Sequence, residues 1–91
     1  MKSELQRIPG VGSGMAKRLE AIGCPTLESL RGRDPEELYL RECAMKGYQE
    51  DRCALYVWRT AVYYADHEAR DPGKLKRWYW KDKTYPEKED L

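Results

Sequence analysis

The fold is decided by Ile8-Pro9-Gly10-Val11-Gly12-Ser13-Gly14-Met15-Ala16-Lys17-Arg18-Leu19. Before the glycines, Leu5 and Ile8 have helical spacing, and after them Ala16 and Leu19 have it. Proline restricts the residue before it, and glycine adopts tight-turn conformations without a steric penalty. The stretch therefore predicts two short helices joined by a Gly-x-Gly turn.

Helical signals continue through most of the chain. The pattern predicts helices over about residues 2–8, 13–22, 26–30, 35–44 and 49–67. Ser13, Thr26 and Asp34 are the predicted N-caps, and Gly23 is predicted to end the second helix. Alternation of period two is absent except around residues 78–80. The sequence thus predicts an all-α fold, a compact domain of four to five helices.

Size and composition predict one small domain. The chain has 91 residues, of which 41% are hydrophobic, and we expect a helical domain over residues 1–70 followed by a basic and aromatic tail over residues 71–91. The tail is expected to pack partly on the domain and to fray at residues 87–91. No apolar run is long enough for a membrane span, and the N-terminus lacks the apolar stretch of a signal peptide. We therefore expect a cytoplasmic protein with no membrane contact.

The charge is unevenly distributed. The net charge is only +1, whereas nucleic-acid-binding domains are usually strongly basic. Residues 1–33 carry six basic and three acidic residues, and residues 34–51 carry two basic and six acidic residues. Residues 74–83 again hold five basic residues and one acid. The basic potential is therefore expected at the two ends of the chain.

A weak internal repeat appears when the first turn is shifted by 37 residues, which aligns Gly10 with Gly47. The second copy places Glu50 and Asp51 where a helix N-terminus would meet a phosphate. Acids favour a helix start but repel a phosphate. The second copy is therefore interpreted as a degenerate, structural hairpin.

Residues 4–19 resemble the helix-hairpin-helix motif of DNA repair and recombination proteins. A longer part of the chain, about residues 4–83, resembles the small bacterial helix-hairpin-helix proteins known as the pathogenicity-locus family. The stretches that carry this resemblance are residues 5–12 (LQRIPGVG), 30–39 (LRGRDPEELY), 49–59 (QEDRCALYVWR) and 70–76 (RDPGKLK). The resemblance implies a SAM-like, tandem helix-hairpin-helix architecture with an N-terminal hairpin.

The resemblance also implies a phosphate site. In the wider motif family, the amides of the turn and of the following helix N-terminus bind a phosphate of DNA or another nucleic acid. The candidate binding residues here are Gly10, Gly12, Ser13, Gly14, Lys17 and Arg18. Many members carry a lysine at the place of Gly14, so this chain lacks one direct charge contact. The alternative is that the turn only joins two helices.

The tail offers a secondary contact because it interleaves basic and aromatic residues. Its candidates are Lys74, Lys76, Arg77, Trp78, Trp80 and Lys81. Such a mixture can stack on single-stranded bases. The alternative is that one or two of these aromatics fold back onto the core. The aromatic helix over residues 49–67 would then be covered by the tail, or else by a second subunit of a homodimer.

Catalysis and metal binding are not expected. Cys53 and His67 lie about 21 Å apart along one helix, too far for a nucleophile and its base. The spacing of Cys24, Cys43 and Cys53 matches no zinc template, and we expect free thiols, with Cys43 and Cys53 behaving as small buried hydrophobes. The sequence therefore predicts a non-catalytic, non-sequence-specific nucleic-acid-binding module without a cofactor. The alternative is a protein-interaction or self-association module.

Overall fold

The computed structural model describes residues 4–81, except for the side chain of Arg77. In chain order the elements are η1 (Glu4–Arg7), α1 (Ser13–Ala21), α2 (Leu27–Leu30), α3 (Pro35–Lys46), α4 (Arg52–Asp66), η2 (Pro72–Leu75) and η3 (Arg77–Trp80), where η marks a 3₁₀ turn. No strand occurs in this range, so the all-α prediction is confirmed with four α-helices. None of the described helices is both long and apolar enough to cross a membrane. The expectations for residues 1–3 and for a frayed end at 87–91 fall outside the described range.

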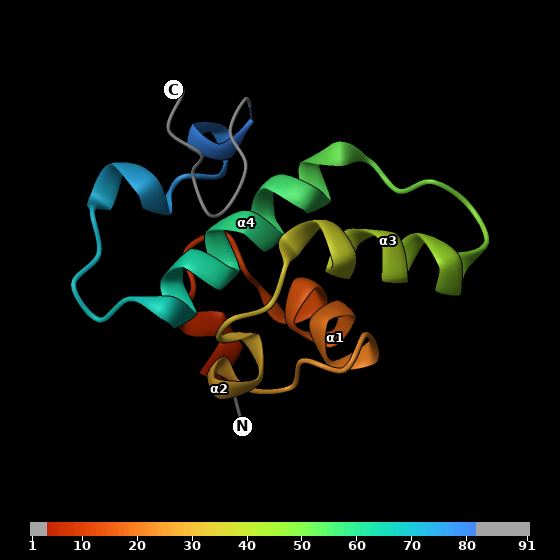
Figure 1. Cartoon of the computed structure of the whole chain (residues 1–91), viewed down its shortest axis with the longest axis horizontal. Coiled ribbons are helices and arrows are strands. Elements are labelled where there is room, and N and C mark those ends of the chain that lie inside the picture. The colour runs from red at the N-terminus through yellow and green to blue at the C-terminus, as the bar shows by residue number, and fades with distance from the viewer. Residues whose placement is uncertain (1–3, 82–91) are drawn as a thin grey trace.

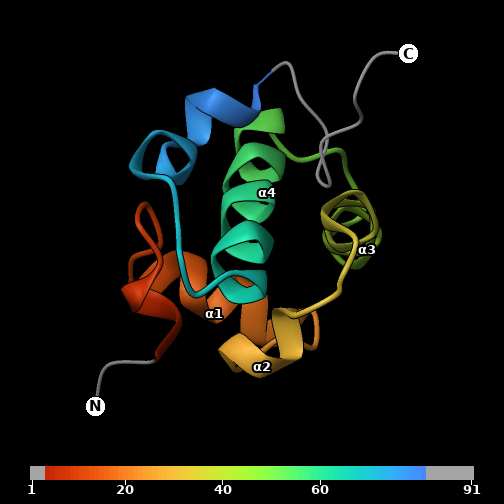
Figure 2. The ribbon, with the colours of Figure 1, turned by 60° about the vertical axis from the view of Figure 1, so that its left-hand side comes forward.

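Helix α4 forms the centre of the domain (Figure 1). Helix α3 packs on one side of α4, and α2, η2 and η3 also contact it (Figure 2). Nine of the fifteen residues of α4 are buried, so this helix is covered around most of its circumference. A helix in that position is expected to be apolar on several sides, as this one is.

Side chains cap three of the helices. Thr26 caps α2 within a capping box, Asp34 caps α3, and Asp51 caps α4, accepting first-turn amide hydrogen bonds of 3.1, 3.0 and 2.8 Å, respectively. Gly23 follows α1 with φ of +95°, the left-handed conformation that ends helices. The predicted caps at Thr26 and Asp34 and the predicted helix end at Gly23 are therefore confirmed.

Several boundaries differ from the predictions. The first segment is a 3₁₀ turn rather than an α-helix, because Pro9 prevents its continuation. The N-cap of α1 is Gly12, and Ser13 is the first helical residue. Helix α3 passes the predicted end at residue 44 and stops at Gly47, whose φ is +76°. Helix α4 starts three residues later than predicted, because Asp51 caps it.

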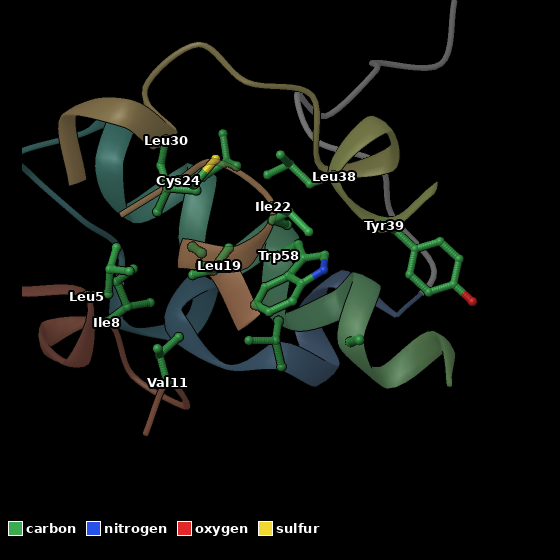
Figure 3. Close-up of a cluster of buried hydrophobic side chains, with 14 of the residues drawn as sticks. Leu5, Ile8, Val11, Leu19, Ile22, Cys24, Leu30, Leu38, Tyr39 and Trp58 are labelled. Carbon is green, nitrogen blue, oxygen red and sulfur yellow. The ribbon is translucent and has the colours of Figure 1, made fainter. Parts of the chain in front are cut away.

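The core joins the N-terminal turn to the central helix (Figure 3). Leu5, Ile8 and Val11 are 0%, 1% and 4% exposed, so three apolar side chains anchor the turn. Trp58 of α4 is fully buried in the same cluster. The turn is therefore a fixed part of the domain, because Val11 within it inserts into the core.

The described part of the tail packs on α4. Trp80 is fully buried, and its ring centroid lies 5.6 Å from that of Tyr63. The Trp80 indole N–H donates to the Lys74 carbonyl at 2.8 Å, and Arg59 Nη1 donates to the Trp80 carbonyl at 2.7 Å. The Asp71 amide donates to the Tyr63 hydroxyl at 2.8 Å. One tail aromatic, Trp80, therefore packs into the core beside α4.

The internal repeat does not extend to the packing. Gly10 and Gly47 both have a left-handed conformation, with φ of +86° and +76°. However, Met45 and Tyr48 are 58% and 60% exposed, whereas the residues aligned with them, Ile8 and Val11, are buried. The second turn therefore shares a glycine conformation with the first turn but lacks its apolar anchor.

The three cysteines are free. Cys24 is buried, and burial raises the pKa of its thiol. Cys43 is partly buried, but Cys53 is exposed. The expectation that Cys53 is buried is wrong, because this residue lies on the exposed side of the start of α4, whereas the next two residues, Ala54 and Leu55, lie on its buried side.

Candidate functional site

The first turn presents three glycines to the outside. A Cβ atom added at Gly10, Gly12 or Gly14 would meet no atom within 4 Å, and all three residues are exposed. Only Gly10 requires glycine for its conformation, with φ of +86°, whereas Gly12 has an ordinary extended conformation with φ of −91°. Glycine at positions 12 and 14 therefore leaves open space in front of the backbone.

The amides at the start of α1 have no side-chain acceptor in the described part of the chain. Among residues 4–81, no side chain caps this helix, whereas Thr26, Asp34 and Asp51 cap the other three α-helices. The first intrahelical bond joins the Ala16 amide to the Gly12 carbonyl at 2.9 Å, so the amides of residues 13–15 precede the helical hydrogen-bond ladder. Such amides, at the positive end of the helix dipole, form an anion-binding geometry.

Lys17 lies on the helix face that begins at Ser13, the first residue of α1. It is exposed and has no ion-pair partner within residues 4–81. Lys17 follows Ser13 by four residues, so the two share a helix face, and helical side chains lean toward the N-terminus. Its ammonium group can therefore approach an anion bound at the first-turn amides.

Arg18 has a different environment, because Glu42 of α3 holds it. Its Nε and Nη2 atoms donate to the two Glu42 carboxylate oxygens at 2.7 Å each. Its Nη2 also lies 3.5 Å from Glu50, and its guanidinium carbon lies 5.4 Å from the Trp58 ring centroid. The hydrogen bond to Glu42 raises the pKa of Arg18. The structure thus places this candidate residue in a contact between α1 and α3.

Lys46 extends this charged cluster. Its Nζ atom lies 2.7 Å from Glu50 and 3.8 Å from Glu42. The hydrogen bond from Lys46 lowers the pKa of Glu50, and the same contact raises the pKa of Lys46. Glu50 therefore contacts Arg18 of α1 and Lys46 of α3. Its neighbour Asp51 caps α4.

The turn and the tail meet at a groove. Pro9 and Gly10 line it on one side, and Leu75, Lys76 and Trp78 line the other, around a volume of about 320 Å³. Trp78 is 66% exposed, and the Lys76 Nζ atom lies 5.5 Å from its ring centroid. The structure therefore brings the primary and secondary candidate segments together.

The remaining tail candidates have different surroundings. Trp80 is fully buried, so it is not a surface contact, because its ring fills the core beside α4. Lys74 is partly buried, and its Nζ atom lies 5.9 Å from the ring centroids of Tyr63 and Tyr79. Lys81 is exposed after η3. Arg77 was also predicted as a contact, and its side chain is not among those that the structure describes.

The sequence reasoning missed Glu42 as the residue that fixes Arg18. Glu42 is 2% exposed, yet it lies 24 residues from Arg18 and no local pattern joins them. No three His, Cys, Asp or Glu side chains gather as metal ligands between residues 4 and 81.

Comparison with known proteins gives a family match and one similar curated protein. The family model described as Pathogenicity locus matches residues 1–85. The Mitomycin resistance protein McrB of Streptomyces lavendulae is 39% identical over 64 residues, which are 70% of this chain and 61% of that protein. The matched part thus spans about three fifths of the length of that relative. No solved structure matches the chain.

Proposed function

The chain belongs to the pathogenicity-locus family, and we propose that it is a non-catalytic module that binds the phosphate backbone of DNA or another nucleic acid. In this proposal η1, the turn and α1 act as a helix-hairpin-helix. The contact is to phosphate and not to base edges, so it does not read sequence.

The observation that carries the proposal is the uncapped start of α1. The amides of residues 13–15 are at an exposed helix end that no side chain of residues 4–81 caps. Gly12 and Gly14 leave the space in front of them open. An oxyanion at this place would accept the hydrogen bonds that capping side chains accept in the other α-helices.

Charge supports the same location. Lys17 is free to add an attraction that depends on salt concentration. Arg18 is assigned no phosphate contact, since Glu42 occupies its guanidinium group. With Gly14 in place of a lysine, we expect weak binding that high salt abolishes.

The test is fluorescence anisotropy with labelled duplex and single-stranded oligonucleotides over a salt series. For duplex DNA, Lys17→Gln should lower the magnitude of the log–log salt slope by about 0.9, the value for one lost phosphate contact. Arg31→Gln is the matched control, because Arg31 is exposed at the end of α2 and makes only a surface ion pair of 3.4 Å with Glu28. An absence of binding at low salt, or equal effects of both variants, would exclude this function.

A second candidate function is protein interaction or self-association. It is favoured by exposed apolar side chains on α3 and the turn after it, where Leu40, Met45 and Tyr48 are 64%, 58% and 60% exposed. Trp58 and Tyr63 of α4 are buried and offer no such surface. Light scattering over a concentration series tests the homodimer, and a Leu40→Glu variant should dissociate it if this surface forms the contact.

A further inference from the structure

We infer that the groove between the first turn and the tail binds an unpaired nucleic-acid base, so that the chain prefers single-stranded nucleic acid to continuous duplex. The base would stack on Trp78, and the adjoining phosphate would lie near Lys76 and the Pro9–Gly10 turn. This inference rests on the proposed function, because the same strand must be held by its backbone.

The size and lining of the groove favour a small, flat group. Its volume of about 320 Å³ lies at the lower end of the range for small-molecule pockets. Pro9, Leu75 and Trp78 make much of the lining apolar, and Lys76 supplies a cation at its edge. A base with its phosphate has the same combination of an apolar face and an adjoining negative charge.

Trp78 is placed as a stacking platform. Its indole is 66% exposed, and aromatic rings stack on any base because every base has a π-face. The backbone beside it is fixed, since Trp80 is fully buried and exchanges hydrogen bonds with Lys74 and Arg59. On a fixed backbone, only the side-chain rotamers of Trp78 lose conformational entropy when a base binds.

The charge around the groove complements a phosphate. Residues 71–81 hold four basic residues and one acid. That acid, Asp71, already accepts the Gly73 amide at 2.8 Å. In Figure 2, α3 lies across α4 from the first turn and η2, and Glu36 at the start of α3 is paired with Arg59.

A continuous duplex cannot supply such a base. Its bases are paired and stacked, and extrusion of one of them costs a few kcal/mol. A duplex would therefore contact only the α1 amides and the nearby cations. The groove adds affinity only for a single strand or for an unpaired end.

The test compares a labelled single strand, the same strand with abasic positions, and the blunt duplex of the same sequence. Trp78→Ala should weaken binding to the intact single strand by about 5- to 150-fold, the range for loss of one base stack. It should leave duplex binding nearly unchanged and have no further effect on the abasic strand. Trp78→Phe keeps a ring and should retain most of the affinity.

The outcomes separate the two proposals. If wild-type protein binds neither strand form, the proposed function fails, and this inference fails with it. If wild-type protein binds both forms and Trp78→Ala weakens neither, or weakens both equally, the backbone contact stands and the groove inference is overturned. Thermal unfolding checks that Trp78→Ala, an exposed position, leaves the domain folded.

Discussion

Substitution of Gly12 by aspartate should have opposite effects on stability and on binding. Gly12 is the N-cap of α1, with φ of −91° and ψ of −169°, a conformation typical of capping residues. An added Cβ meets nothing within 4 Å, so the new side chain fits without strain. Its carboxylate would accept the amide of Gly14 or Met15, which are the second and third residues of the helix.

The magnitudes follow from the capping and the charge. Aspartate should improve on glycine as a cap by a few tenths of a kcal/mol. A negative charge at the helix N-terminus adds about 0.3–1 kcal/mol. Together these correspond to a rise in melting temperature of about 2–10 °C for a domain of this size. The same carboxylate occupies the proposed phosphate site, and the loss of one charge-assisted hydrogen bond weakens binding by about 10- to 150-fold.

The assay pairs thermal unfolding, followed by circular dichroism, with anisotropy measurements at low salt. Gly12→Asn is the matched control, since asparagine caps nearly as well as aspartate but carries no charge. Gly12→Asn should raise the melting temperature by less than Gly12→Asp does, and it should weaken nucleic-acid binding by less. A folded Gly12→Asp variant that binds like wild type would refute a phosphate on the α1 amides. A lower melting temperature would instead refute the capping geometry.

Three further predictions concern the packing. Trp80→Ala should lower the free energy of unfolding by about 3–5 kcal/mol, measured in urea, because Trp80 is fully buried; a loss well below this would show that the tail is not part of the core. Arg18→Met should cost about 2–4 kcal/mol, somewhat less than for a wholly unpaired buried charge, because Lys46 remains 3.8 Å from Glu42. The double variant with Glu42→Leu should recover much of that loss, and additive losses would contradict this account. The pKa of Glu50 lies below its ordinary value of 4.5, chiefly because of Lys46. This ion pair therefore stabilises the folded state above pH 4.5, and the stabilisation is lost as the pH falls through the lowered pKa of Glu50. Glu50→Gln should accordingly flatten the decline in stability as the pH falls below about 4.5. An unchanged pH profile would count against it.

Local features of the fold could be predicted from the sequence. Helix caps depend on only three or four neighbouring residues, so the caps at Thr26 and Asp34 and the helix end at Gly23 could be predicted from the local sequence. The helical periodicity of residues 52–66 likewise identified the central helix. The first turn was predictable because Pro9 restricts the residue before it and Gly10 permits the left-handed conformation of a tight turn.

Features that depend on distant contacts could not be predicted. Trp78 and Trp80 are two residues apart in a similar local sequence, yet one is 66% exposed and the other is fully buried. The space beside α4 that accepts Trp80 exists only in the folded domain. For the same reason, the sequence could not distinguish Arg18 from Lys17 as a phosphate-binding candidate. Glu42 binds Arg18 only when α3 has packed against α1.

The net charge of +1 understates the basic character of the candidate surface. Each of the six acids in residues 34–51 has a contact inside the domain, either as a helix cap or as a partner of a basic side chain: Asp34, Glu36, Glu37, Glu42, Glu50 and Asp51. By contrast, Lys17 and Lys76 have no ion-pair partner among the described residues. These lysines lie on the turn and tail segments that carry the proposed phosphate site and the groove. A phosphate would therefore meet a local cationic surface, because much of the acidic charge is occupied elsewhere, and a domain of small net charge can bind nucleic acid at one face.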